Sequence, residues 1–353
     1  MKKIFVSIIC VSFPFLLAIF IALLVVANQY SNEIKSYYKF LTRFTSYNSN
    51  DFNNGKHILR IRILNRPLFE PTHMLTFDRI LKERYNLIYV SDNSYDLVID
   101  GPRRDWTEHK TIDNKKAVKF FYTEEAETPN IQDYDLSIGY DHIDNPGYIR
   151  IPYVYVDHYR HKFHDIDINY DRKKEQGECN PKKPIFACML VRSVTNSEGA
   201  RKRPSLFYKL SLYKDVSSGG MALNNIGYEI AYYDSMKFMS QCKFVIAYEN
   251  KDHDGYITEK VFQAYFSGAM PIYYGNRTVM HDINKQAIIY EGDFKTENEL
   301  VDYIKKVDQD DELYCKKWNQ NIISQPEKSY NAVYTKLRTK IFEVLDEKLK
   351  QNK

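Results

Sequence analysis

The chain has 353 residues, with 50 Lys and Arg against 46 Asp and Glu, and a formal net charge of +4. At roughly 150 residues per domain this length predicts two domains, and a hydrophobic content of 44% is enough for two cores. The near balance of charge leaves no concentrated basic stripe of the kind that binds a phosphate backbone. Nucleic acid is therefore excluded as a partner.

The first 27 residues predict a membrane anchor. Lys2 and Lys3 form a short cytoplasmic segment (residues 1–3) before an uncharged apolar run over residues 4–27. A helix over this run would cross the ~30 Å of hydrocarbon in a bilayer. The alternative is a cleaved signal peptide, but its apolar region usually has only ~7–15 residues. With the lysines held inside, we expect a single-pass type II protein whose catalytic part is lumenal.

The rest of the chain is predicted to form two α/β domains. The polar segment 28–56 is interpreted as a stem. Residues 57–165 alternate short apolar strands with polar or helical stretches, which favours a mainly parallel sheet. Segment 166–184 is dense in charge and is interpreted as a linker, although a solvated loop explains it equally well. The same alternation returns over 185–325, and a final helix with one apolar face is predicted over 326–353.

The five cysteines give two alternatives. They are Cys10, Cys179, Cys188, Cys242 and Cys315, and no two of them form a C-x-x-C pair that would indicate zinc or thiol redox chemistry. The four outside the predicted anchor could form disulfides in an oxidising lumen. They could also be small buried hydrophobes, and this second interpretation is slightly preferred.

One stretch has the pattern of a binding site in an α/β sheet. Residues 244–248 form a continuous apolar run, typical of a strand buried on both faces. A polar loop over 249–257 follows, and Thr258 is a good N-cap for the next helix. Gly268 suits the end of that helix, and residues 271–274 form the next strand. Ligands of such sheets bind at the carboxyl ends of the strands.

Lys260 is unusual in this stretch. It lies in the first turn of the predicted helix, where a cation opposes the helix dipole. A bound anion such as a diphosphate would remove the conflict, because helix N-termini bind anions. The alternative is that Lys260 merely pairs with Glu259 or faces solvent. The residues alone leave both interpretations open.

The stretch resembles the signature of a known family. The matching positions are Glu249-Asn250, Tyr256, Thr258-Glu259-Lys260, Gly268, Pro271-Ile272-Tyr273 and Gly275. Together they are similar to the α1,3/4-fucosyltransferases, glycosyltransferase family ten. The similarity covers roughly residues 118–290, and it is sparser in the first domain. Upstream it includes Arg203, Gly219-Gly220, Asn224-Asn225-Ile226-Gly227, Phe121-Tyr122-Thr123-Glu124-Glu125 and Asp135-Leu136-Ser137-Ile138-Gly139-Tyr140.

The resemblance implies a fold and a set of site residues. The fold is of the GT-B type, with two Rossmann-like domains facing a central cleft, plus the N-terminal transmembrane helix. The implied donor-binding residues are Arg203, Glu249, Asn250, Tyr256, Glu259 and Lys260. Arg203 and Lys260 would lie against the diphosphate, and Glu125 would be the general base. The family commonly has Gly-Glu-Asn here, whereas this chain has Glu124-Glu125-Ala126, so Glu124 stays open as the base.

The implied activity is transfer of L-fucose from GDP-L-fucose to a sugar hydroxyl with inversion, α1,3 on a GlcNAc-containing oligosaccharide or glycoconjugate. Two fixed cations can stabilise the departing GDP, so no cofactor or metal is required, and stimulation by Mn²⁺ is left open. The D-x-D strings 165–167 and 252–254 are interpreted as chance matches to metal-nucleotide motifs, and the sequon at 276–278 as incidental.

Two alternatives to this function remain. One keeps the fold and uses another GDP-sugar as the donor. The other is a membrane-tethered glycan-binding protein without turnover, which only the departure at Ala126 favours. Whichever function holds, we expect the part of the chain after the anchor to lie in the lumen of the Golgi or of an equivalent secretory compartment. This compartment can also be that of a host cell.

Overall fold

The computed structural model describes residues 55–65, 75–102, 111–152 and 172–351. The anchor predicted over residues 4–27 and nearly all of the predicted stem lie outside these ranges. Among the described helices, none is both long and apolar enough to span a bilayer. The chain divides into two compact units, one of Met1–Arg62 and Arg66–Tyr95, the other of Ile63–Asn65 and Asp96–Lys353.

The described part of the first unit is a small β-α-β arrangement. Strand β1 (His57–Ile63) belongs to this unit except for its last residue, and its residues 57–61 pair in parallel with β2 (Tyr85–Tyr89). Helix α2 (Leu75–Lys82) lies between the two strands in the sequence. In β1 the side chains of Leu59 and Ile61 are buried while Arg60 between them is exposed. This alternation is typical of a strand with one face in a core.

The second unit begins with parallel strands in the order β3-β4-β5-β6. They are β3 (Leu97–Asp100), β4 (Val118–Tyr122), β5 (Leu136–Gly139) and β6 (Tyr148–Arg150), and a short 3-10 helix, η3 (Ile131–Asp133), precedes β5. The side chains of β3 and β5 are buried throughout. Since the strands are parallel, the segments that follow β4, β5 and β6 emerge at one edge of the sheet.

The second unit also contains a parallel sheet in the order β11-β10-β9-β7-β8. Its strands are β7 (Ile185–Met189), β8 (Val216–Ser218), β9 (Cys242–Tyr248), β10 (Met270–Tyr274) and β11 (Ile289–Tyr290). Every residue of β9 and β10 is buried. Tyr248 pairs with Tyr274, so β9 and β10 end level. The predicted strands at 244–248 and 271–274 are confirmed, and β9 begins two residues earlier.

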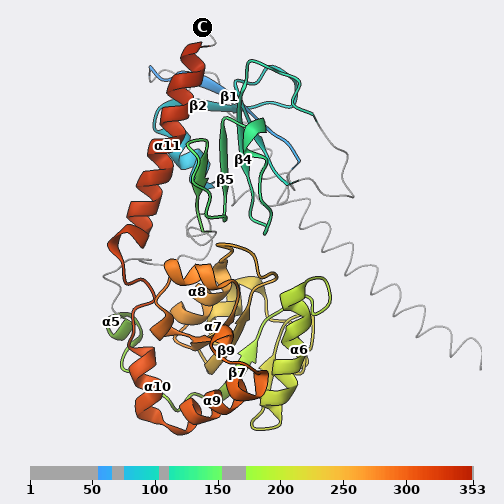
Figure 1. Ribbon diagram of the computed structural model, residues 1–353, viewed down its shortest axis with the longest axis vertical. Coiled ribbons are helices and arrows are strands. Elements are labelled where there is room, and N and C mark those ends of the chain that lie inside the picture. Colours follow the sequence, from blue (N-terminus) through green and yellow to red (C-terminus); the bar gives the residue numbers. More distant parts are fainter. Residues whose placement is uncertain (1–54, 66–74, 103–110, 153–171, 352–353) are drawn as a thin grey trace, which may run out of the picture. The chain divides into compact units, whose positions relative to one another are not determined.

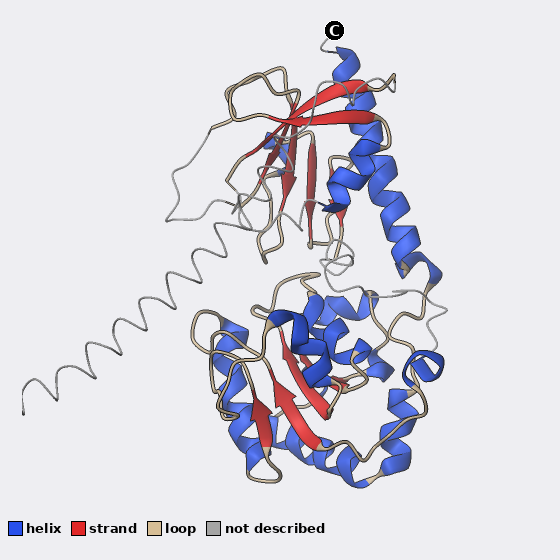
Figure 2. Ribbon diagram, turned by 180° about the vertical axis from the view of Figure 1, so that it is seen from behind, coloured by secondary structure: helices blue, strands red, loops and turns tan. Residues whose placement is uncertain are grey.

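Helices enclose this sheet, and both α6 and α8 contact its central strand β9 (Figures 1 and 2). The α-helices are α5 (Arg172–Gln176), α6 (Glu198–Ser211), α7 (Ser235–Met239), α8 (Glu259–Phe266), α9 (Glu297–Gln309), α10 (Asp311–Trp318) and α11 (Tyr330–Gln351). The 3-10 helices are η4 (Tyr232–Asp234), η5 (Arg277–His281), η6 (Lys285–Ala287), η7 (Glu291–Asp293) and η8 (Pro326–Lys328). Gly268 follows α8 with a φ of +86°, as its predicted place after the helix requires.

The cysteines outside the predicted anchor are paired in two disulfides, Cys179–Cys315 and Cys188–Cys242. The slight preference for free, buried thiols was therefore wrong. Cys188 and Cys242 are fully buried, as that preference assumed, but they lie on the neighbouring strands β7 and β9, with Cα atoms 6.0 Å apart. Contact between strands brings together cysteines that are distant in the sequence, which composition alone cannot reveal.

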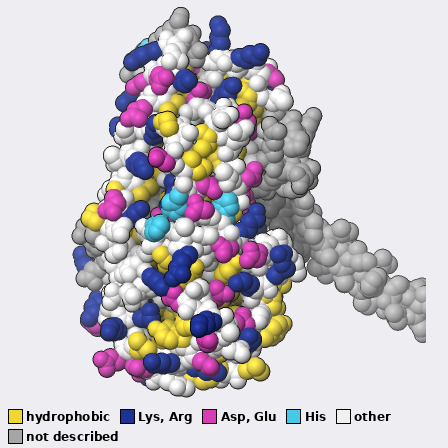
Figure 3. Space-filling model, viewed as in Figure 1, with side chains coloured by type: hydrophobic (Ala, Val, Ile, Leu, Met, Phe, Trp, Pro, Cys, Tyr) yellow, Lys and Arg dark blue, Asp and Glu magenta, His cyan; other side chains and the backbone are white. Residues whose placement is uncertain are grey.

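The surface shows no large field of one sign on the face drawn in Figure 3, where basic and acidic side chains are intermixed over the described residues. This agrees with the near balance of 50 basic and 46 acidic residues.

Candidate active site

The candidate site is built around the loop from β9 to α8 (residues 249–258), hereafter the donor loop, which lies in the second unit. The loop is fixed at its start, because the amide of Glu249 donates to the carbonyl of Tyr274 at 2.9 Å. The amide of Gly199 in α6 donates to the carbonyl of Asn250 at 2.8 Å. A Cβ at Gly199 would lie 2.0 Å from the carbonyl oxygen of Glu249. Glycine is therefore needed for α6 to reach the end of β9.

Glu249 is the first residue after β9, and its side chain is fully buried. Its Oε1 accepts from the amide of Thr258 at 2.7 Å, and its Oε2 accepts from Thr258 Oγ1 at 2.7 Å and from Lys260 Nζ at 3.1 Å. Both oxygens accept hydrogen bonds within the protein, so Glu249 holds the start of α8. Its predicted part in donor binding stays a prediction.

Thr258 lies at the predicted N-cap position of α8, but its side chain makes no capping hydrogen bond. The hydroxyl donates to Glu249 and accepts from Lys260 Nζ at 2.9 Å. A buried carboxylate is a stronger partner for a hydroxyl than a helix amide. The capping rule predicted the place of this residue correctly and the direction of its hydroxyl incorrectly.

Lys260 is about a quarter exposed, with its ammonium 3.1 Å from Glu249 Oε2 and 3.8 Å from Glu259 Oε1. Burial lowers the pKa of Lys260, but the carboxylates of Glu249 and Glu259 raise the pKa by more, so it is above its usual value. Lys260 is therefore a fixed cation in the first turn of α8. It pairs with Glu259, as one alternative expected, but more closely with Glu249.

Arg203 brings a second cation to the same strand end. Its guanidinium is buried and donates to the carbonyl of Tyr248 at 2.8 Å and to Asn250 Oδ1 at 2.7 Å, the residues on either side of Glu249. A third bond goes to the carbonyl of Ser193 at 2.9 Å. Burial lowers the pKa of Arg203, and nearby carboxylates oppose this, so arginine stays charged. The two cations therefore lie around one strand end.

The buried Nε of Arg203 has no hydrogen-bond partner among the described residues. Buried polar groups are nearly always paired, and an unpaired one has a cost. An unpaired donor on a fixed cation is consistent with a site that binds an anion.

Tyr256 connects the donor loop to the segment after β4. Its buried ring packs edge-on against Tyr140, with centroids 4.9 Å apart, and Ala126 completes the cluster. The hydroxyl of Tyr140 donates to the carbonyl of Glu124 at 3.2 Å. Burial raises the pKa of Tyr256, and the charges of Glu249 and Glu125 raise it further. Glu125 is therefore within electrostatic range of the same loop.

Glu125 is exposed, and its backbone is held by Thr123. Thr123 Oγ1 accepts from the amide of Glu125 at 3.0 Å and lies 3.2 Å from its carbonyl oxygen. Glu124 uses its carbonyl to accept from Tyr140, and its side chain is partly buried. The more exposed carboxylate, Glu125, is the better placed of the two to meet a substrate.

The D-x-D string at residues 252–254 is engaged by the protein itself. Asp254 accepts from the amide of His142 at 2.7 Å, and His253 Nε2 lies 2.9 Å from Asp141 Oδ1. Over the described ranges, no group of three or more His, Cys, Asp or Glu is arranged to hold a metal ion. The other string, at 165–167, lies outside those ranges.

The sequon also has a structural use. Asn276 Oδ1 accepts from the amide of Thr278 at 3.0 Å at the start of η5, and the amide of Gly255 donates to Thr278 Oγ1 at 2.8 Å. These bonds hold the donor loop from the side of η5. The interpretation of the sequon as an incidental match to a glycosylation site stays a prediction.

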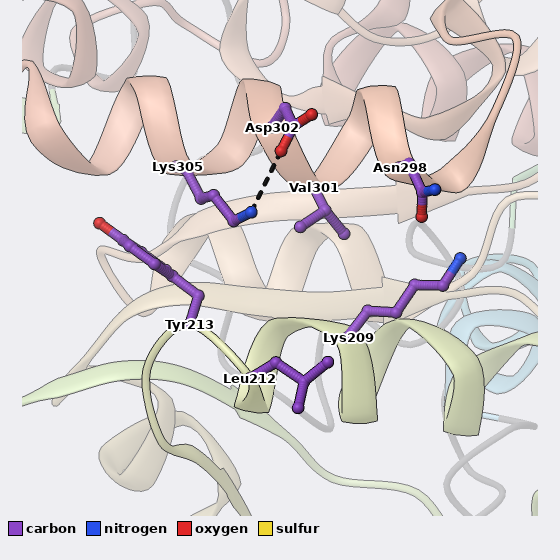
Figure 4. Close-up of a pocket in the computed structure, with 7 residues that line it drawn as sticks. All are labelled: Lys209, Leu212, Tyr213, Asn298, Val301, Asp302 and Lys305. Carbon is purple, nitrogen blue, oxygen red and sulfur yellow. Dashed lines mark hydrogen bonds and ion pairs between the residues drawn. The ribbon is translucent and has the colours of Figure 1, made fainter.

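A cavity of about 360 Å³ lies between α6 and α9, outside the candidate site (Figure 4). It is lined by Lys209, Leu212, Tyr213, Asn298, Val301, Asp302 and Lys305. Its two lysines are paired, Lys305 with Asp302 at 3.1 Å and Lys209 with Glu297 at 2.7 Å. It shares no residue with the candidate site.

Sequence reasoning missed Arg150, which ends β6. Its guanidinium forms a bidentate ion pair with Asp282, in which Nη1 donates to Oδ1 at 2.7 Å and Nη2 donates to Oδ2 at 2.6 Å. An arginine at the end of a buried strand is the only local signal, and it does not reveal a partner 132 residues away.

A parallel α/β fold with two cations at a buried strand end is the arrangement expected of a site that binds an anionic ligand such as a diphosphate. The family model described as glycosyltransferase family 10 (fucosyltransferase) C-term matches residues 181–351. This match covers 171 of the 353 residues, just under half of the chain, and it agrees with the sequence resemblance.

Curated relatives agree with this assignment. The chain is 32% identical over 251 residues to alpha-(1,3)-fucosyltransferase FucT of Helicobacter pylori, covering 64% of this chain and 52% of the relative. It is 30% identical over 141 residues to 4-galactosyl-N-acetylglucosaminide 3-alpha-L-fucosyltransferase 9 of Mus musculus, covering 39% of this chain and 38% of the relative. The matches thus span about half, or less, of the length of these relatives.

Solved structures confirm the fold. A crystal structure of an α1,3-fucosyltransferase matches with a TM-score of 0.69 at 25% identity, over 83% of this chain and 92% of the other. The structure with GDP-fucose matches with a TM-score of 0.67 at 25% identity, over 88% and 95%. The α/β fold with parallel sheets is therefore that of known fucosyltransferases.

Proposed function

We propose that the protein transfers L-fucose from GDP-L-fucose to a sugar hydroxyl, in an α1,3 linkage on a GlcNAc-containing glycan. The observation that carries this proposal is the position of Arg203 and Lys260 around the end of β9, with Glu125 in electrostatic range of the same loop. The match of residues 181–351 to the fucosyltransferase family model supports the same donor.

In the proposed mechanism the acceptor oxygen attacks the anomeric carbon of fucose, and the bond from that carbon to the phosphate oxygen breaks. Glu125 accepts the proton of the attacking hydroxyl, a contribution of ~10²–10⁴-fold in rate. The negative charge that grows on the leaving GDP is stabilised by Arg203 and Lys260, which are already fixed before the reaction. Asn250 and Tyr256 keep Arg203 and the loop in place. No metal is required in this proposal.

The donor is tested by incubating the purified full chain with GDP-fucose, GDP-mannose, UDP-galactose and UDP-glucose. The acceptor is a β-galactosyl-(1→4)-N-acetylglucosaminide, and release of GDP or UDP is measured with EDTA and with Mn²⁺. We expect release from GDP-fucose at least tenfold faster than from the other donors, and turnover in EDTA. Faster release from GDP-mannose would instead support another GDP-sugar, and glycan binding without release would support a binding protein.

We further propose that residues 4–27 anchor the protein and that the catalytic part is lumenal, in the Golgi or an equivalent compartment. Disulfides persist in oxidising compartments and are rare in the cytosol. The bonds Cys179–Cys315 and Cys188–Cys242 therefore support a location on the oxidising side of the membrane.

The pairing is tested by alkylating the protein, isolated from its native membranes, before any reduction. We expect all four cysteines to resist alkylation after denaturation, and linked peptides to be found by mass spectrometry. Each bond closes a long loop, worth on the order of 4 kcal/mol in the chain-entropy account. Reduction should therefore lower Tm by roughly 10 °C or more. Full alkylation without reduction would contradict the proposed compartment.

A further inference from the structure

Arg150 connects three segments that are distant in sequence. Its Nε donates to the carbonyl of Tyr140 at 2.6 Å, and one terminal nitrogen donates to the carbonyl of Gly255 at 2.7 Å. The guanidinium also forms the paired bond to Asp282. The side chains of Arg150 and Asp282 are 13% and 4% exposed, so solvent hardly weakens this pair.

Gly255 makes the contact with Arg150 possible. It has a φ of +63°, and a Cβ there would lie 2.1 Å from the carbonyl oxygen of Tyr140 and 2.7 Å from Arg150 Nε. The donor loop therefore approaches the end of β5 too closely to leave room for a side chain at this position. The next residue is Tyr256, so the position of Gly255 fixes where that ring lies.

Tyr140 connects Arg150 to the residues beside Glu125, the proposed base. Its carbonyl is held by Arg150, its ring packs on Tyr256, and its hydroxyl donates to the carbonyl of Glu124. Ala126 belongs to the same cluster. The residues before and after Glu125 are therefore both tied to Tyr140.

We propose that Arg150, paired with Asp282, is a positioning residue that sets the place of Glu125 relative to the donor loop. This inference rests on the proposed function. Buried ion pairs add little net stability but can select one geometry. A misplacement of about 1 Å between reacting groups costs on the order of 10²-fold in rate. Arg203 and Lys260 are held by other partners, so the donor cations do not depend on Arg150.

The test is Arg150→Lys. Lysine keeps the charge, but as a point charge it cannot reproduce the fork that holds three segments. We expect kcat for fucose transfer to fall about 30-fold or more, while Kd for GDP, measured by calorimetry, changes less than about threefold. In the Glu125→Gln background, adding Arg150→Lys should slow transfer less than about threefold further, because Arg150 acts through Glu125.

Arg172→Lys is the matched control. Arg172 is also buried and donates to the carbonyls of Trp318, Tyr265 and Ala269, away from the candidate site. We expect it to lower Tm while kcat below Tm stays within about threefold of wild type. If Arg150→Lys does not fold, Asp282→Asn replaces it, since it keeps one acceptor for Arg150.

Two results would overturn the inference. One is a loss of kcat in Arg150→Lys no larger than in Arg172→Lys. The other is a rise in Kd for GDP by the same factor as the fall in kcat, which would place Arg150 in donor binding. Both results can be obtained only if the wild-type protein transfers fucose. A wild-type protein without transfer would contradict the proposed function, and this failure is thereby distinguished from a failure of the inference about Arg150.

Discussion

Lys260→Met is expected to slow fucose transfer by about 10²–10³-fold and to weaken binding of GDP, because it removes one of two fixed cations from the proposed diphosphate site. Lys260 is held by Glu249 and Thr258 before any ligand binds. Little reorganisation is then needed when charge develops on the leaving group. Methionine keeps much of the length of the side chain, so the change is mainly one of charge.

The measurement that isolates the diphosphate is the ratio of Kd values for guanosine and GDP. Lys260→Met should weaken GDP and leave guanosine within about twofold, because guanosine has no phosphate for the cation to bind. An equal loss for both ligands would show that the whole site had changed. An unchanged GDP affinity together with an unchanged kcat would remove Lys260 from the proposed mechanism.

Lys243→Met is the control for loss of a buried lysine. Its ammonium lies 3.0 Å from Asp308 Oδ1 and is almost fully buried, at the opposite end of β9 from Glu249. We expect this variant to be less stable than the wild type and to have the wild-type ratio of Kd values for guanosine and GDP. If Lys260→Met is unstable because Glu249 is left without its cation, Glu249→Gln/Lys260→Met removes both charges. The same loss of GDP affinity is expected there.

The local elements of the site could be predicted from the sequence. A strand buried on both faces must be apolar throughout, which located β9 and β10. Gly268 marked the end of α8 because only a few residue types accept a positive φ. These signals depend only on residues that are close together in the sequence, so the sequence is enough to predict the elements they mark.

The contacts between distant segments could not be predicted in this way. Cys188 and Cys242 are 54 residues apart, and Arg150 and Asp282 are 132 apart. Such pairs depend on which strands and loops become neighbours, and nothing in the local pattern records that. The complete burial of Glu249 and its bond to Lys260 are also contacts that the local pattern does not record.

Glu125→Gln is expected to slow transfer by about 10²–10⁴-fold, while GDP-fucose still binds. The amide has the same size as the carboxylate but cannot take the proton of the acceptor hydroxyl. Glu125 is exposed on a loop that is held through its backbone by Thr123. We therefore expect stability to change by less than about 0.5 kcal/mol, so that lost activity is not lost folding.

Glu124→Gln separates the two candidate bases. The carbonyl of Glu124 accepts from Tyr140, a backbone contact that the substitution leaves intact. If Glu125 is the base, Glu124→Gln should keep transfer within about tenfold of wild type and Glu125→Gln should not. The reverse result would assign the base to Glu124, as the altered family triplet allows. Loss of GDP-fucose binding in Glu125→Gln would contradict the assigned role, because a base that meets only the acceptor hydroxyl has no part in holding the nucleotide.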